Sequence, residues 1–236
     1  MLSHFSRRIT EKAEDKHTAP VLIVPFGDSV TQGCFEIDHI DHEHVYHNRL
    51  KQMLEERYPQ TTFSVLNAGC GGETALNGLK RLERDIIRHA PDLVLVGFAL
   101  NDACAGLQEL DQYATAMRDI IDGIRRNTSA DIIILSPNFM ATHNNSNIAP
   151  AHHKVADRII RCQNDGILKR YVETLRKLAS EMQVPLADVY AEWEQMAMEG
   201  IDTTSLLSNG LNHPDIPRQQ MIADKVFELI CQLKKI

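Results

Sequence analysis

The sequence predicts an α/β fold, a three-layer sandwich in which a mainly parallel, five-stranded sheet lies between two layers of helices. The first observation is a series of five short apolar runs, each of a length that suits a strand buried on both faces. The second is that segments with one apolar stripe at helical spacing lie between these runs. This alternation, with short connections, is typical of right-handed crossovers between parallel strands. The runs cover residues 21–26, 63–66, 93–98, 132–135 and, more weakly, 184–189.

The chain of 236 residues is long enough to bury one core without dividing, and its 43 % hydrophobic and 24 % charged content is average for a globular protein. We expect a polar, solvated extension over residues 1–18, followed by a single domain over residues 19–236. The first residues contain no apolar stretch of signal-peptide length, and no apolar run could span a bilayer. These features favour a cytoplasmic protein without a membrane partner.

Three helical segments follow from the spacing of apolar residues. Leucine and isoleucine recur every three or four residues over 76–86, and a second stripe covers 113–124. The last stretch, 217–236, repeats the pattern, with Asp215 placed to cap it. An irregular stretch rich in Asn and His, residues 139–165, is expected to pass over the carboxyl ends of the strands, where parallel sheets place their sites.

The net charge of −7, from 25 basic and 32 acidic residues, argues against nucleic acid as a partner, because such binding needs a cationic surface. The five cysteines are odd in number and form no CxxC pair, so neither a disulfide framework nor a cysteine zinc site is indicated. No GxGxxG follows the first run, which disfavours a nucleotide cofactor. We therefore expect no cofactor, and the sequence leaves the oligomeric state open.

The first strand leads into GDSVTQG, which places Ser29 in a strand-to-helix turn. Gly27 can supply an unusual backbone angle there, and a hydroxyl that projects from the edge of the sheet is well placed to act as a nucleophile. Asp28 and Ser29 would equally suit a helix cap, so this segment alone leaves both interpretations open.

Two further segments could supply hydrogen-bond donors. NAGCGGET, after the second strand, has Gly72 before a helix, where a substrate can approach a backbone N–H group. GFALND, after the third strand, presents the carboxamide of Asn101. Tight turns that need glycine or Asn would explain either segment by itself. Asp28 and Asp102, which follow Gly27 and Asn101, are candidates for substrate binding.

NGLNHPD places His213 in a loop just before the last helix. A loop histidine on its own is usually a surface residue. All four segments, however, follow predicted strands or precede the closing helix, so one topology would gather them at one edge of the sheet. A serine and a histidine in contact there would form a nucleophile and its general base.

In these four blocks, which span Gly27 to Pro214, the sequence resembles the SGNH hydrolases, also called GDSL esterases and lipases. The resemblance implies a flavodoxin-like SGNH fold and a serine ester hydrolase that works through an acyl-enzyme. It implies that Ser29 is the nucleophile and His213 the base. It also implies that Gly72 and Asn101 help to form the oxyanion hole.

Two positions depart from the family pattern. The third block usually reads GxND, whereas Ala99 stands at the glycine position here. The family commonly has an aspartate three residues before the histidine, and this position is Gly210, preceded by Asn209. Asn209 would then replace the acid and orient the imidazole through its carbonyl oxygen, with weaker stabilisation of the imidazolium than a carboxylate gives. Asp202, Asp215 or a backbone carbonyl are the alternatives.

A histidine-rich segment follows the first block. Its spacing fits no established metal-ligand pattern, so we expect no metal and treat the segment as a polar loop or as a wall of the substrate pocket. The residues concerned are His39, His42, His44 and His47, with Asp38, Asp41 and Glu43.

The expected reaction is hydrolysis of a small or short-chain ester, with an acetylated carbohydrate or a similar polar ester as the leading substrate. This preference rests on the resemblance and on the lack of a long apolar segment that would cover a lipid. A thioesterase or lysophospholipase is the second enzyme hypothesis. A ligand-binding module that kept the SGNH scaffold but catalyses weakly is the third, and the missing aspartate is the feature in its favour.

Overall fold

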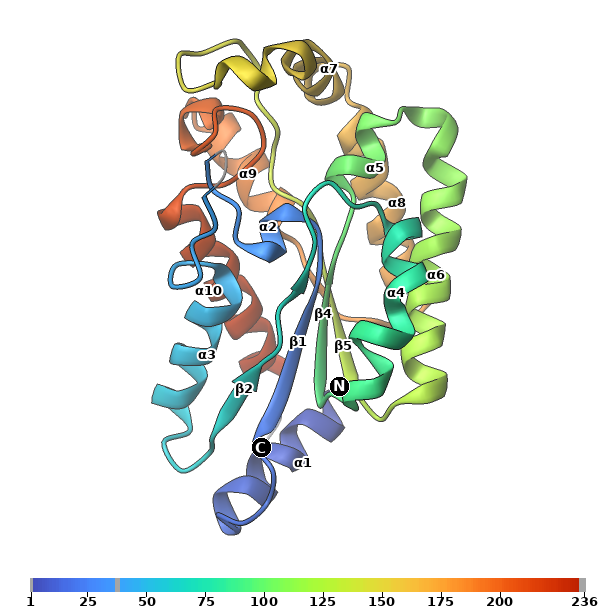
Figure 1. Cartoon of the computed structure of the whole chain (residues 1–236), viewed down its shortest axis with the longest axis vertical. Coiled ribbons are helices and arrows are strands. Elements are labelled where there is room, and N and C mark those ends of the chain that lie inside the picture. The colour runs from blue at the N-terminus through green and yellow to red at the C-terminus, as the bar shows by residue number, and fades with distance from the viewer. Residues whose placement is uncertain (1, 37–38, 234–236) are drawn as a thin grey trace.

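The computed structural model describes residues 2–36 and 39–233, and the strands within these ranges form one parallel sheet (Figure 1). The sheet order is β2-β1-β4-β5-β6, with helices on both faces, so the predicted three-layer fold is confirmed. The strands are β1 (Val21–Gly27), β2 (Phe63–Val65), β3 (Ala68–Gly69), β4 (Leu93–Gly97), β5 (Asp131–Leu135) and β6 (Leu186–Ala187).

The second predicted strand is present in two parts. β2 pairs with the first half of β1, and β3 pairs with the end of β1 at Phe26 and Gly27. Both parts lie on the same side of β1, so the five expected positions of the sheet hold six strands. The break matters because β3 brings the block that contains Gly72 up to the carboxyl end of β1.

Helices cover both faces of the sheet and thereby bury its apolar strands. On one face, α3 (Tyr46–Arg57) packs against α10 (Ile216–Leu233). The other face carries α4 (Ala75–Asp85), α6 (Leu110–Asn127) and α8 (Ile167–Glu181). The predicted stripe of α6 is buried, which confirms that segment. In the described residues, no helix is both long and apolar enough to cross a membrane.

The stripe of α4 differs from the predicted one by a rotation of the helix. Ala75, Gly78 and Leu82 are buried, whereas Leu76 and Leu79 are only half-buried. Gly78 lies so close to the sheet that a Cβ there would come within 2.6 Å of the Phe98 ring. Gly78 thus lets α4 pack closely against the sheet. The buried face of the helix is therefore not the one that the spacing of its leucines predicts.

Short helices gather at the carboxyl ends of the strands, at the top of Figure 1. The stretch over residues 139–165, expected to be irregular, contains helix α7. The helices at this end are α2 (Ser29–Gln32), α5 (Leu100–Cys104) and α7 (His153–Asn164). The remaining elements are α9 (Val189–Met198) and the 3-10 helices η1 (Ile87–His89), η2 (Leu107–Glu109), η3 (Pro150–His152) and η4 (Thr203–Leu206).

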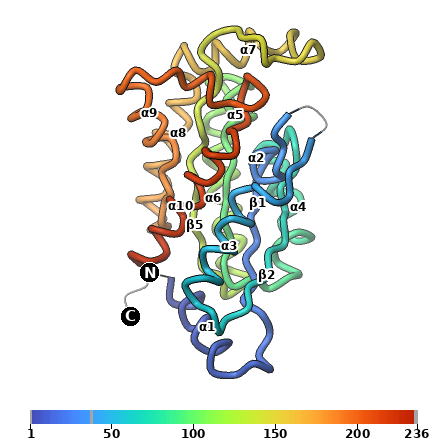
Figure 2. The backbone as a smooth tube through the Cα atoms, turned by 90° about the vertical axis from the view of Figure 1, so that its left-hand side faces the viewer, coloured from blue at the N-terminus to red at the C-terminus, as the bar shows by residue number. Residues whose placement is uncertain are grey.

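The first residues form a packed helix and not the solvated extension that we expected. Helix α1 (Ser3–Glu14) lies at the end of the molecule opposite α7, and it buries Phe5 and Ile9 (Figures 1 and 2). The backbone N–H of Phe5 donates to the Asp131 carboxylate at 2.8 Å, at the start of β5. Two apolar residues among charged neighbours were too weak a pattern to predict this burial.

Candidate active site

Ser29 begins helix α2 directly after β1, where the chain has almost no free space. A Cβ at Gly27 would lie 2.3 Å from Thr31 Oγ1 and 2.5 Å from the carbonyl oxygen of Gly97. Only glycine therefore allows the strand to turn into the helix here. The turn holds the Ser29 side chain at the carboxyl end of β1.

His213 meets Ser29 from the opposite end of the chain. Its Nε2 lies 2.9 Å from Ser29 Oγ, across a sequence separation of 184 residues. The loop that carries His213 is closed by a bridge between Leu207 and Pro214, and α10 begins immediately after it. The two segments that the sequence analysis paired are thus in hydrogen-bond contact.

A backbone carbonyl orients the His213 ring. Nδ1 lies 3.0 Å from the carbonyl oxygen of Phe35, which also accepts a hydrogen bond from Ser208 Oγ at 2.9 Å. A carbonyl can only accept, so Nδ1 must carry the proton and Nε2 must be free of it. Nε2 is then the acceptor for the Ser29 hydroxyl, which is the arrangement that general-base catalysis needs.

The interpretation of Asn209 as the group that orients the ring is wrong. Its Oδ1 accepts from the backbone N–H groups of Leu211, Asn212 and His213, at 2.9–3.0 Å, and its Nδ2 donates to Asn212 Oδ1. An Asn side chain prefers such local bonds in a tight turn. Asn209 therefore stabilises the loop that carries His213. Its position four residues before the histidine does not bring its side chain to the imidazole ring.

Burial makes His213 a base that stays neutral. It lowers the pKa of the imidazole to about 4, while the hydrogen bond to Phe35 opposes this shift and His152 adds to it. The usual value is near 6.5, so an unprotonated ring is available at neutral pH and well below it.

The second and third blocks supply donors next to Ser29. Gly72 has φ 76°, a left-handed conformation, and nothing lies within 4 Å of the place where its Cβ would be. Asn101 donates one hydrogen of its Nδ2 to the carbonyl oxygen of Glu73 at 3.0 Å, which leaves the other for a ligand. Ala99, at the family's glycine position, is the residue before the start of α5. Ser29, Gly72 and Asn101 line one cleft together with His213.

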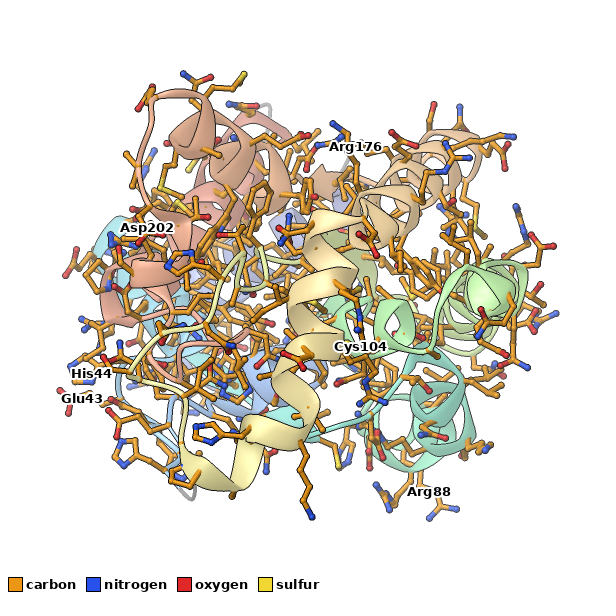
Figure 3. All side chains as sticks on the ribbon, turned by 90° about the horizontal axis from the view of Figure 1, so that it is seen from above. Glu43, His44, Arg88, Cys104, Arg176 and Asp202 are labelled. Carbon is orange, nitrogen blue, oxygen red and sulfur yellow. The ribbon has the colours of Figure 1, made fainter. Side chains whose placement is uncertain are left out.

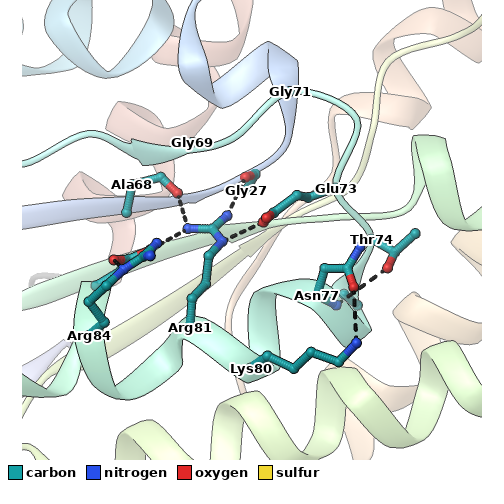
Figure 4. Close-up of polar contacts among 12 residues, drawn as sticks. Gly27, Ala68, Gly69, Gly71, Glu73, Thr74, Asn77, Lys80, Arg81 and Arg84 are labelled. Atoms are coloured by element: carbon teal, nitrogen blue, oxygen red, sulfur yellow. Dashed lines mark hydrogen bonds and ion pairs between the residues drawn. The ribbon is translucent and has the colours of Figure 1, made fainter.

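Arg81 links these blocks through its hydrogen bonds, although nothing about its position in the sequence points to this role. From α4, its guanidinium donates to the carbonyl oxygens of Gly27 and Ala68 at 3.0 and 2.7 Å, and it pairs with Glu73 and Asp85 (Figure 4). The Arg81 side chain is only 7 % exposed, so these bonds are made in a water-poor environment. Because Glu73 in turn accepts from Asn101, Arg81 fixes the donor loop relative to the end of β1.

Asp28 and Asp102 were candidates for substrate binding, and the structure assigns both to the interior. Asp28 accepts from the Val30 N–H at 3.0 Å and lines a separate internal cavity of about 30 Å³. Asp102 accepts from the Ala75 N–H at 2.9 Å, at the start of α4. Burial raises the pKa of Asp28 to about 7 and that of Asp102 to about 6. Both carboxyl groups therefore cap helices next to the site.

The cleft that contains Ser29 and His213 has a volume of about 530 Å³. Its outer wall comes from η3 and α7, and in Figure 3 α7 crosses this edge of the molecule beside Cys104 of α5. A second hollow of about 330 Å³ adjoins it and shares Glu36, His152 and Asn209 with it. The stretch over residues 139–165 thus contributes a wall of the site.

The histidine-rich segment has structural roles in the described residues, to which Asp38 does not belong. His44 Nδ1 bonds to Asp41 at 2.7 Å, and Figure 3 shows His44 on the outer edge of the molecule. His47 is buried and donates from Nε2 to the carbonyl oxygen of Thr31 at 3.0 Å, under the nucleophile helix. In the residues that the structure describes, no three His, Cys, Asp or Glu side chains are grouped as metal ligands.

Comparison with known proteins identifies the family. The model of the GDSL-like lipase/acylhydrolase family matches residues 26–216. Among solved structures, the chain is similar to Axe2, an acetylxylan esterase from Geobacillus stearothermophilus, with a TM-score of 0.69 and 18 % identity over 92 % of this chain and 96 % of that one. It is also similar to the lipase/acylhydrolase from Enterococcus faecalis, with a TM-score of 0.67 and 22 % identity over 90 % and 96 % of the two chains.

No curated protein sequence matches the chain. At identities of 18 and 22 %, the two solved structures show a shared fold. The family match covers all four blocks, from the end of β1 to the start of α10. The chain belongs to the GDSL-like lipase/acylhydrolase family, the SGNH hydrolases, and is a carboxylic ester hydrolase.

Proposed function

We propose that this protein hydrolyses short-chain esters of polar alcohols, with Ser29 as the nucleophile and His213 as the only side chain that acts as its base. The contact of 2.9 Å between Ser29 Oγ and His213 Nε2, with the other ring nitrogen bound to a carbonyl oxygen, carries the proposal. A dyad with this tautomer can transfer a proton without a carboxylate. This geometry favours catalysis over the alternative of a weakly catalytic binding module.

In the first half of the reaction, His213 Nε2 takes the proton of Ser29 as Oγ attacks the ester carbonyl carbon. The backbone N–H groups of Ser29 and Gly72 and the free amide hydrogen of Asn101 stabilise the oxyanion. Each such donor contributes about 3 to 4 kcal/mol to the transition state. The tetrahedral intermediate then collapses to an acyl-enzyme as His213 gives its proton to the departing alcohol.

In the second half, His213 removes a proton from water, which attacks the acyl-enzyme and releases the acid. The imidazolium that forms in each half is stabilised by the Phe35 carbonyl dipole, which is a weaker partner than a carboxylate. The lowered pKa of His213 is consistent with this, since no negative group contacts its Nδ1.

The alcohol is expected on the His213 side of the cleft, because that residue must protonate it. Polar side chains line this side, and the adjoining hollow of about 330 Å³ extends it. Hydroxyl-rich alcohols such as sugars can bond to Asn209, Asn212 and Glu36 there. The fold shared with an acetylxylan esterase supports the same class of alcohol, a carbohydrate.

The test is kinetic and covalent. Ser29→Ala and His213→Ala should each lower the kcat for 4-nitrophenyl acetate by about a thousandfold or more. A fluorophosphonate should label Ser29, as mapped by peptide mass spectrometry. Ser205→Ala, which changes an exposed serine near the same loop, is the control and should keep wild-type activity. Labelling at another residue, or an active Ser29→Ala variant, would refute the assignment.

We also propose a cytoplasmic location. All five cysteines are free thiols, which fits a reducing compartment. Cell fractionation with a periplasmic or secreted marker as reference tests this, and recovery with that marker would contradict it.

A further inference from the structure

The wall formed by η3 and α7 presents one helical face to the cleft. His152, Val155, Arg158 and Ile159 are spaced by three or four residues and all line the cleft opposite Ser29. Residues at this spacing share one side of a helix. The face is apolar at Val155 and Ile159 and carries a permanent positive charge at Arg158.

The side chain of Arg158 is exposed and forms no hydrogen bond or ion pair within residues 2–36 and 39–233, although the chain carries seven more acidic than basic side chains. The hydrogen bond with Cys162 is the main cause that lowers the pKa of the Cys104 thiol, and the charge of Arg158 lowers it further. Cys104 lies on α5, three residues after Asn101, and lines the cleft as well. Arg158 therefore lines the same cleft as Cys104 and acts on that thiol, which ends α5.

The geometry of ester hydrolysis assigns this side to the acyl group. The carbonyl oxygen must point at Gly72 and Asn101, and the departing oxygen must point at His213. The remaining substituent, the acyl chain, is left for the rest of the lining, which includes Ala105 next to α5 and Val155, Arg158 and Ile159 on α7.

We propose that the preferred acyl group carries a carboxylate at its far end, so that the substrate is a half-ester of a short dicarboxylic acid and Arg158 binds its free carboxylate. The proposal rests on the proposed function, since it uses Ser29 and His213 to place the chain. A negative group on the alcohol is disfavoured, because Glu36 lines that half of the cleft. A guanidinium matches a carboxylate with two parallel N–H bonds, which suits it to this role.

The experiment compares two esters of equal chain length that differ at the acyl terminus. These are 4-nitrophenyl pentanoate and the mono-4-nitrophenyl ester of glutaric acid. Arg158→Gln should lower the ratio of kcat/KM for glutarate to kcat/KM for pentanoate by about ten- to hundredfold, mostly through KM, since a charged hydrogen bond to bound substrate is lost. Arg158→Lys should keep part of the preference.

Two controls sharpen the comparison. Lys154→Gln removes a positive charge from the same helix at an exposed position and should leave the ratio unchanged. Ser29→Ala gives the background, because the free carboxylate of glutarate can attack its own ester without the enzyme.

An unchanged ratio in Arg158→Gln would overturn the proposal. The proposal would also be overturned if Arg158→Gln selectively lost activity on 4-carboxyphenyl pentanoate. That result would mean that Arg158 binds an anion on the alcohol and not on the acyl group. If neither 4-nitrophenyl ester is hydrolysed above the Ser29→Ala background and no fluorophosphonate label reaches Ser29, the failure belongs to the proposed esterase function instead.

Discussion

The site residues illustrate how a main-chain atom can take a role that the sequence assigns to a side chain. The spacing in NGLNHPD pointed to Asn209 as the partner of His213, yet its lone pairs face N–H groups of its own turn. The actual partner is the carbonyl oxygen of Phe35, 178 residues away. Every residue has such an oxygen, so nothing in the sequence distinguishes this one. Ser29 and His213, by contrast, are recognisable because their chemistry depends on side-chain type.

One prediction at this scale concerns Asp202 and Asp215, the two carboxylates that the sequence offers as alternatives to Asn209. Asp215 caps α10 through the Arg218 N–H, and Asp202 caps η4 through the Thr204 N–H. Asp215→Asn and Asp202→Asn should each keep kcat within about threefold of wild type, because asparagine caps helices as well as aspartate does. Loss of the acid from a serine triad lowers kcat by about ten thousandfold.

The measurement is kcat on 4-nitrophenyl acetate at neutral pH, with His213→Ala as the inactive reference. If kcat falls by a hundredfold or more in either asparagine variant, that carboxylate is the third member of the catalytic group.

At the scale of elements, the strands were predictable and the packing between elements was less so. Apolar runs identified the strands because parallel strands are buried on both faces. Helix α1 was missed because two apolar side chains suffice when a neighbouring element supplies the rest of the contact. Arg81 was missed because an arginine on an amphipathic helix ordinarily points to solvent. Arg81 has buried acceptors only because the tertiary fold places the carbonyl oxygens of Gly27 and Ala68 next to α4.

Removal of Arg81 should therefore affect both stability and catalysis. Arg81→Met leaves two buried carbonyl oxygens without their donor and removes an ion-pair partner from Glu73 and Asp85, and it should lower the free energy of unfolding by about 3 kcal/mol. It should also lower kcat by about tenfold, because Glu73 no longer holds the Asn101 carboxamide in place.

The matched control for this prediction is Arg84→Met. Arg84 pairs with Asp85 on the same helix but is 70 % exposed, so the change should leave the free energy of unfolding close to that of the wild type. Urea unfolding gives the stabilities, and kcat is measured at a temperature where both variants are folded. Equal effects of the two substitutions would contradict the role given to Arg81.

For the whole molecule, buried titratable groups set opposing trends of stability with pH. The pKa of Asp28 is raised to about 7, so its contribution to stability is complete below about pH 4 and is lost as the pH rises to 7. The pKa values of His47 and His213 are lowered to about 4, so their contribution is complete above about 6.5 and is lost as the pH falls to 4. The two trends offset one another in the intervening range.

The substitution Asp28→Asn should separate the trend caused by Asp28 from the trend caused by the two histidines. Asparagine keeps the cap on Val30 but cannot ionise, so the difference in unfolding free energy between variant and wild type should grow in favour of the variant by about 2 to 4 kcal/mol from pH 4 to 7. Urea unfolding at several pH values measures it. Asp119→Asn, on the exposed side of α6, is the control and should give a constant difference. A constant difference for Asp28→Asn as well would contradict the raised pKa.

The separation of 184 residues between Ser29 and His213 has a consequence for the folding of the enzyme. A pair so distant in sequence forms only after nearly the whole chain has been synthesised, because the loop that carries the imidazole precedes the final helix. Contacts of this kind close late in folding, since the entropy of a long loop must be overcome before they form. Turnover should therefore be among the last properties to return during renaturation, and fragments that end before His213 lack the base and should be inert however well their sheet assembles.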